Sequence, residues 1–251
     1  MGSPAEPCLY WRTFIAMPGV EREVSVATAS APSVGRLVLV PALITLAVTL
    51  LRLSGELLGW SPLLVNRAPG GPGALIGIVW LVPVFGAWFG LRLARAGQAP
   101  AGVGRVAGHG ILAVLAGAAL SAAGPLLGAP PPVQLAGLVL GTVAAVAVAW
   151  RGWPALGRVL LAYALAARIP VALVMLAAIL GDWGTHYDVV PPGFDATMGP
   201  LAKWVFIGLV PQLTAWVGFT VAVGTVFGAA GAALARRQAA SPADALGPVT
   251  G

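Results

Sequence analysis

The chain has 251 residues, of which 59% are hydrophobic and 9% are charged, and its formal net charge is +6. A soluble domain has about 25% charged residues, so this composition excludes most soluble proteins. The basic residues are scattered and form no run, which argues against nucleic acid as a partner. The single cysteine, Cys8, excludes an intrachain disulfide and a multi-cysteine metal site. We therefore expect the lipid bilayer to be the main partner.

Six long apolar segments, separated by Pro-rich and Gly-rich breaks, predict six transmembrane helices. A helix of about 20 apolar residues is long enough to cross the hydrocarbon core of a bilayer. The expected spans are 37–58, 74–94, 106–127, 133–150, 157–181 and 203–229. The predicted fold class is all-α, a polytopic membrane protein built as a bundle of six transmembrane helices.

Two tails are expected around this membrane domain. Residues 1–35 are rich in Pro, Ser, Ala and Glu and contain no continuous apolar stretch, which predicts a mobile cytoplasmic N-terminal tail. The six-helix transmembrane domain is expected over 36–237, followed by a disordered C-terminal tail over 238–251. Either Met1 or Met17 could be the start of translation.

The distribution of Lys and Arg predicts the orientation, because cytoplasmic loops carry an excess of these residues. On one side lie Arg52, Arg67 and Lys203, and Arg168 lies inside a span. The other ten basic residues share the opposite side: Arg12, Arg22, Arg36, Arg92, Arg95, Arg105, Arg151, Arg158, Arg236 and Arg237. We therefore expect both termini to be cytoplasmic. Abundant Gly, Ala and Arg with a single Lys favour a GC-rich bacterial source, and hence the bacterial cytoplasmic (inner) membrane.

Small residues recur at four-residue spacing in three of the expected spans. Such spacing lets helix backbones approach closely in lipid. The residues are Ala113, Gly117 and Ser121, then Gly137 and Gly141, then Thr220, Gly224 and Gly228. Packing inside the bundle is the expected use of these faces, with a homo-oligomer or another membrane subunit as the alternative partner.

Arg168 is the one charged residue predicted to lie deep in a span. An Arg at the centre of a membrane helix costs about 2.5–3.5 kcal/mol, so its side chain should face the bundle interior or a wet cavity. By helical rise, Gln212 and Thr214 of the last span lie at a similar depth. Arg168 could clasp Gln212 and nearby backbone carbonyls, bind an anionic ligand or lipid head group, or snorkel to the inner surface.

Arg52 and Glu56 form a second polar feature, near the outer end of the first span. Residues four apart on a helix lie on one face and can neutralise each other. The pair is expected to be a simple ion pair that eases insertion. The alternative is that it forms one wall of an outward-facing polar cavity.

The outer loop after the fifth span holds the densest set of ionisable side chains. Asp182 and His186 are four residues apart and Asp188 follows two residues later. Imidazole and carboxylate groups suit several divalent cations, and they can also act as a general acid and base. A polar cap over the bundle is the simpler interpretation. The cofactor, if any, is left unknown by the sequence.

Three functions remain open. The chain has no Gly-x-Ser-x-Gly, His-Glu-x-x-His or P-loop pattern, and its loops are short. The first hypothesis is therefore a non-enzymatic structural or accessory subunit of a membrane complex. The second is a small carrier or channel for an anionic or proton-coupled solute that uses Arg168. The third is a membrane enzyme with an outer-face Asp/His site.

Overall fold

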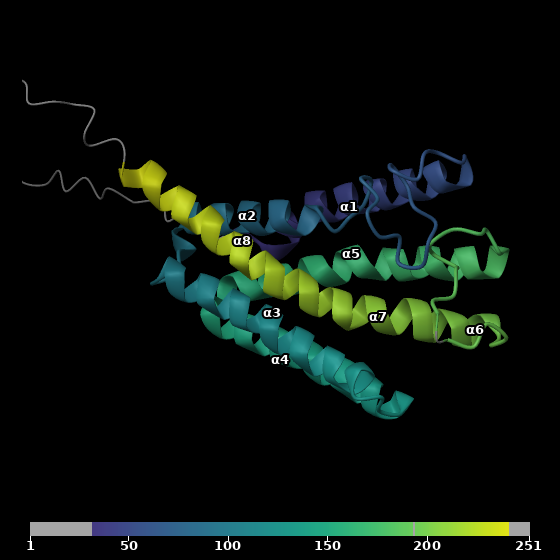
Figure 1. Ribbon diagram of the computed structural model, residues 1–251. Coiled ribbons are helices and arrows are strands. Elements are labelled where there is room, and N and C mark those ends of the chain that lie inside the picture. Colours follow the sequence, from purple (N-terminus) through teal and green to yellow (C-terminus); the bar gives the residue numbers. More distant parts are fainter. Residues whose placement is uncertain (1–31, 193, 241–251) are drawn as a thin grey trace, which may run out of the picture. The chain divides into compact units, whose positions relative to one another are not determined.

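The computed structural model describes residues 32–192 and 194–240, and every regular element in these ranges is helical. Figure 1 shows their arrangement. In chain order the elements are α1 (Val34–Leu57), α2 (Leu81–Leu93), a π-helical turn η1 (Ala94–Gln98), α3 (Val103–Leu126), α4 (Pro131–Gly152), α5 (Pro154–Gly181), α6 (Pro200–Lys203), a π-helical turn η2 (Trp204–Leu209), α7 (Val210–Leu213) and α8 (Ala215–Ala240).

Five of the described helices are long and apolar enough to cross a membrane. They are α1, α3, α4, α5 and the continuous stretch Pro200–Ala240, which joins α6, η2, α7 and α8. Four of the predicted spans agree with these helices to within three residues at each end. These findings indicate a helical, multi-pass membrane protein.

The predicted span 74–94 differs from the structure. Only Leu81–Leu93 is α-helical there, and 13 residues extend about 20 Å, less than the roughly 30 Å of a bilayer core. Residues 58–80 form no regular helix. Gly70, Gly71 and Gly73 have positive φ values, which break a right-handed helix before α2 begins.

The last helix and the tails also differ from the sequence prediction. The last helix extends to Ala240 rather than ending at 229, and α1 starts at Val34. Helix therefore enters both predicted tails. Residues 1–31 and 241–251 of the predicted tails, with Met1, Met17 and Cys8, lie outside the described residues.

The small-residue faces pack against one another within the chain. A Cβ atom added to Gly86 of α2 would lie 2.6 Å from the carbonyl oxygen of Gly224 in α8, so the two backbones are in direct contact. Similarly, Gly117 of α3 lies against Ala145 of α4. Internal packing, the expected use of these faces, is confirmed for these helix pairs.

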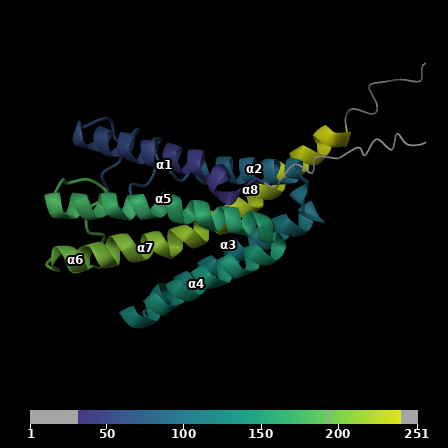
Figure 2. The same ribbon diagram turned by 180° about the vertical axis from the view of Figure 1, so that it is seen from behind.

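Several Arg-containing segments meet at one end of the helices, which we call the Arg-rich end. There the guanidinium group of Arg236 donates to the carbonyl of Pro100, and Trp153 Nε1 donates to the carbonyl of Gln98 at 3.0 Å. Segment 58–80 starts at the other end and runs back toward α2, and segments 182–192 and 194–199 lie at that other end, which we call the loop end (Figures 1 and 2). Most helices run between these two ends.

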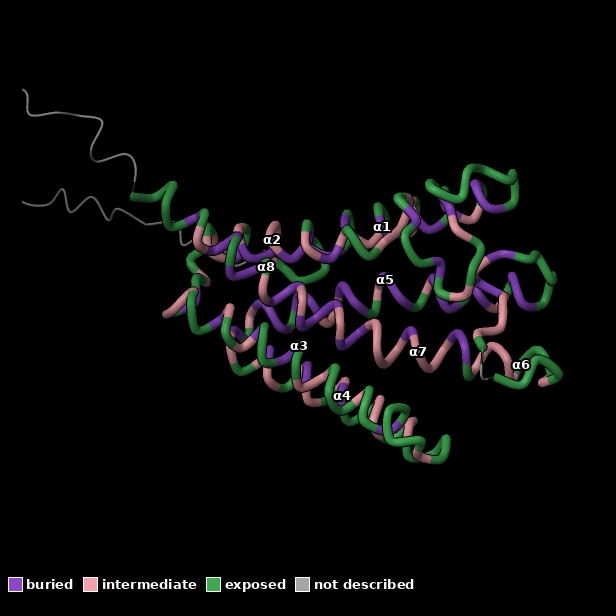
Figure 3. Tube along the Cα trace, in the orientation of Figure 1, coloured by how far each residue is buried: buried purple, intermediate pink, exposed green. Residues whose placement is uncertain are grey.

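Burial is unequal among the helices, as Figure 3 shows. The central helix α5 buries Leu156, Leu160 and Tyr163 almost completely. By contrast, α3 and α4 bury few residues and keep many large apolar side chains exposed, as expected for helices that face lipid. Arg168 thus lies in one of the most enclosed helices of the bundle.

Candidate functional site

Arg168 lies near the middle of α5, about 20 Å of helix from either end, and its side chain is only 3% exposed. Among the described residues its one hydrogen bond runs from Nη1 to Oε1 of Gln212, at 3.5 Å. This exceeds the usual 2.7–3.2 Å, so the bond is weak. The indole of Trp216 lies 4.6 Å from the guanidinium carbon, within cation–π range. The predicted clasp to Gln212 is present but holds Arg168 only loosely.

No acidic side chain pairs with Arg168 within the described ranges. The ion pair found there joins Glu56 to Arg52, and Glu56 is also hydrogen-bonded to His186. A guanidinium group has five N–H donors, so most of those on Arg168 have no protein acceptor. No fully buried side-chain nitrogen or oxygen among the described residues lacks a hydrogen-bond partner. Arg168 also lines the adjacent cavity, which offers space beside its unpartnered donors.

This cavity has a volume of about 260 Å³ and lies between Arg168 and the loop end. Binding pockets for small molecules usually measure about 300–1,000 Å³, so the cavity is near the lower limit of that range. Its polar and aromatic lining consists of Thr49, Arg52, Arg168, His186, Tyr187, Gln212, Phe194, Phe206 and Trp216. Three of the polar-cavity candidates predicted from sequence, Arg52, Arg168 and Gln212, thus line one cavity.

A bend in the last membrane helix shapes the wall opposite α5. Pro211 has no N–H group, and Thr214 departs from helical geometry at φ −112° and ψ −90°. The π-helical turn η2 precedes this bend and contributes Phe206 and Ile207 to the cavity lining. Such turns are frequent at functional sites. Thr214 itself donates to the carbonyl of Val210 at 2.6 Å and does not line the cavity, unlike the prediction.

The non-helical segment 58–80 closes another side of the cavity. Gly70, Ile78 and Val79 belong to the lining. Non-helical backbone is tolerated at membrane depth only where protein buries it or where it lines a water-filled space. The position of this segment is therefore consistent with a hydrated cavity beside Arg168.

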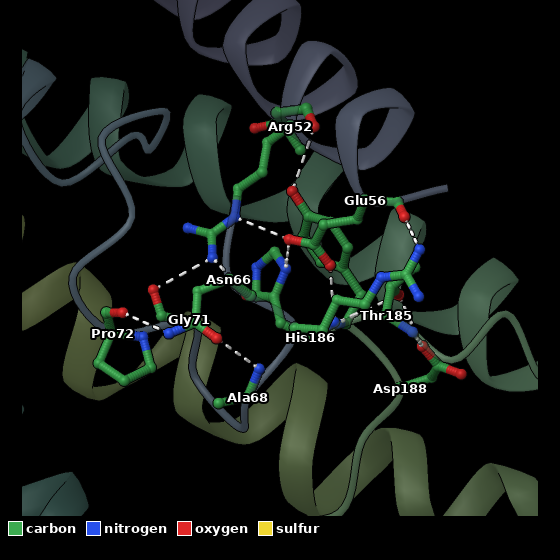
Figure 4. A network of polar contacts seen from close by, with 12 residues as sticks. Arg52, Glu56, Asn66, Ala68, Gly71, Pro72, Thr185, His186 and Asp188 are labelled. Atoms are coloured by element: carbon green, nitrogen blue, oxygen red, sulfur yellow. Dashed lines mark hydrogen bonds and ion pairs between the residues drawn. The ribbon is translucent and has the colours of Figure 1, made fainter. Parts of the chain in front are cut away.

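Glu56 organises a polar network above the cavity, shown in Figure 4. Its fully buried carboxylate accepts from Arg52 Nε at 3.0 Å, from the backbone N–H of His186 at 2.8 Å and from His186 Nδ1 at 2.5 Å. Arg52 also donates to the carbonyls of Asn66 and Gly71, each at 3.1 Å. The network ties α1 to both loops. The predicted Arg52–Glu56 ion pair is confirmed, although Glu56 does not itself line the cavity.

The outer-loop residues serve to hold the loop in place. Asp188 accepts from the backbone N–H of Gly184 at 2.8 Å and from that of Thr185 at 2.7 Å. Asp182 is exposed. Within the described ranges no three His, Cys, Asp or Glu side chains are grouped so that they could hold a metal ion. Asp182, His186 and Asp188, the predicted metal ligands, therefore do not form such a group there.

His186 has an altered acidity because of where it lies. Burial lowers its pKa below the usual 6.5, and the positive charge of Arg52 acts in the same direction. Its hydrogen bond to Glu56 opposes this shift but does not reverse it. The imidazole is thus predominantly neutral near pH 7, with its Nδ1 proton donated to the Glu56 carboxylate.

Sequence reasoning missed two residues that shape the site, Trp216 and Tyr187. Trp216 lies four residues after Gln212, beyond the bend at Thr214, and its position inside a span rather than at a membrane interface was an available signal. Tyr187 donates to the carbonyl of Thr49 at 3.1 Å. No sequence pattern indicates that contact, because 138 residues separate the two.

Comparison with known proteins gives no relative for this chain: no family, no curated protein and no solved structure matches it.

Proposed function

We propose that this protein binds an anionic solute within the membrane, beside Arg168, and acts as a small carrier for it. The observation that supports the proposal is a buried guanidinium group that borders a cavity and has no acidic partner in the described ranges. An uncompensated cation costs much less when an anion occupies the space next to it. Gln212 and Trp216 position the guanidinium group, and the Glu56 network closes the loop end.

The geometry of the site favours transport of an anion over a purely structural role for Arg168. A clasp between helices needs a short, well-directed contact, whereas Arg168 and Gln212 are 3.5 Å apart. The bend at Thr214 and the non-helical segment 58–80 surround the cavity on two sides. Interrupted helices around a site near the bilayer midplane are typical of transporters.

We further propose the topology. The Arg-rich end would face the cytoplasm of a bacterial cell, with both termini on that side of its cytoplasmic membrane. Segment 58–80 would return the chain from the loop end to mid-membrane, where α2 begins. α2 would then complete the sixth crossing. Support comes from Phe85 of α2, whose ring centroid lies 5.5 Å from that of Tyr163, a residue in the inner half of α5.

The direct test is anion binding to wild-type protein and to two Arg168 variants. Methyl phosphate and acetate would be titrated into the protein in neutral-lipid nanodiscs at constant ionic strength, with intrinsic Trp fluorescence as the readout. R168Q should weaken binding at least tenfold, because a hydrogen bond to a charged group contributes about 1.5–3 kcal/mol. R168K keeps the charge and should retain part of the affinity.

Equal affinity in wild type and R168Q, or no binding of either anion to wild type, would contradict the proposal. Transport would then be measured in proteoliposomes loaded with labelled methyl phosphate. We expect faster release through wild type than through R168Q. Equal release rates for wild type and R168Q, despite their different affinities, would show that the site binds the anion but does not transport it.

A further inference from the structure

A second, apolar hollow adjoins the Arg168 cavity. It is a groove of about 480 Å³. The ends of α3 and α4 nearest the loop end lie on one side of it, and the bent part of the last membrane helix lies on the other. Leu135 and Leu138 of α4 form one side, and Phe206, Val210 and Pro211 form the other. None of the residues that line the groove is charged.

The groove and the cavity share part of their walls. Phe194, Phe206 and Pro211 line both. The two hollows are therefore neighbours, and these side chains form part of the wall of each. Phe194 and Phe206 are among the exposed large apolar residues, which suits side chains at an opening rather than in a packed core.

We propose that the ligand is an anionic amphiphile, a membrane lipid whose acidic head group reaches Arg168 and whose acyl chain lies in this groove. The proposal rests on the proposed function and names the class of its ligand. The charges are complementary, because Arg52 and Arg168 line the cavity and no carboxylate does. Arg52 is already paired with Glu56, so Arg168 is the cation left for the head group.

The surroundings of the groove favour a lipid over a free, fully hydrated anion. Leu135 is 40% exposed on a helix that faces lipid, so a chain can enter the groove from the bilayer. A small anion without a chain would leave the groove unfilled. Each methylene group transferred from water into an apolar site adds about fourfold to the affinity.

The test compares methyl phosphate, octyl phosphate and octanol, each titrated into the protein in phosphatidylcholine nanodiscs. L138W fills the groove, and L135W does so from a more exposed position. L140W on the same helix is the matched control, because Leu140 is 58% exposed and does not line the groove. Octyl phosphate partitions into the same bilayer whichever variant is present, so differences in affinity between the variants report binding in the groove.

Wild type should bind octyl phosphate at least about 100-fold more tightly than methyl phosphate. The ratio of the affinity for octyl phosphate to that for methyl phosphate should fall at least tenfold in L138W or L135W and remain unchanged in L140W. R168Q should weaken the binding of octyl phosphate. Octanol should bind more than tenfold more weakly than octyl phosphate.

Two results would overturn the inference. One is an equal ratio in L138W, L135W and L140W, and the other is an equal affinity of wild type for the two phosphates. After either result, the proposed function would still stand if methyl phosphate binds to wild type and binds more weakly to R168Q. If neither phosphate needs Arg168, the proposed function fails as well.

Discussion

Glu56 has the most consequential environment of any acidic residue in the described ranges. Its carboxylate is fully buried and is hydrogen-bonded by Arg52 and by two groups of His186. A buried carboxylate is tolerated only when charge and hydrogen bonds compensate it. The same carboxylate therefore joins α1 to a loop 130 residues away, and that loop contributes His186 and Tyr187 to the cavity lining.

The altered acidity of His186 predicts a pH-dependent stability. Its pKa in the folded protein lies below the unfolded value of about 6.5, so the unfolded chain binds more protons between the two values. The free energy of unfolding should therefore fall as the pH decreases below about 6.5. H186N keeps an N–H donor toward Glu56 and should flatten this dependence.

The measurement is the thermal midpoint of purified protein between roughly pH 5 and 7.5, where a histidine titrates. Glu56, Arg52 and Asp188 also act on His186, and the variant leaves them in place. H109N changes the other histidine of the chain, at the Arg-rich end, and serves as the control. The same slope in H186N and wild type would show that His186 does not cause the dependence.

Among the helices, α2 is short, and its glycine contacts with α8 hold it in place. α2 has 13 residues and buries Val82, Phe85 and Phe89. Its backbone touches α8 at Gly86, where a side chain has no room. Close backbone contact compensates for the short length of α2, because helix association in lipid depends on van der Waals packing.

G86A should therefore destabilise the protein by about 1–3 kcal/mol, since the added methyl group overlaps the backbone of Gly224. G108A is the matched control. A Cβ atom on Gly108 of α3 meets nothing within 4 Å, so this variant should be neutral or slightly more stable through helix propensity. Thermal unfolding in one detergent compares the two, and equal midpoints would argue against a close α2–α8 contact.

The basic residues are divided unequally between the two ends of the molecule, which bears on which end faces the cytoplasm. Eight of the 12 basic residues in the described ranges lie toward the Arg-rich end, three lie toward the loop end, and Arg168 lies between them. The positive-inside rule applies to short loops such as these. The loop end, with the Glu56 network, would then face outward.

Labelling with a membrane-impermeant maleimide tests this orientation. In a C8S background, A68C and A196C at the loop end should react in intact cells. A101C at the Arg-rich end should react only after permeabilisation. All three alanines are exposed in the structure, so differences in labelling report the side of the membrane. The reverse pattern would show that the Arg-rich end is outside.

Sequence alone determined the class of fold, the position of the long helices and the isolation of Arg168. These follow from local composition: apolar length gives a span, Gly and Pro end it, and a lone Arg stands out against it. The Arg52–Glu56 pair was also predictable, because four-residue spacing on a helix brings the side chains together whatever the rest of the chain does.

Tertiary structure decided the rest. The segment around 74–80 is apolar enough for a span, yet it is non-helical and lines the cavity, because preceding glycines with positive φ redirect the chain. His186 was assigned to a possible metal site but donates to Glu56, 130 residues away. Hydrophobic pattern predicts where a helix lies in a bilayer. Which polar side chains meet depends on the packing between helices, and that packing alone placed Arg168, Arg52 and Gln212 around one cavity.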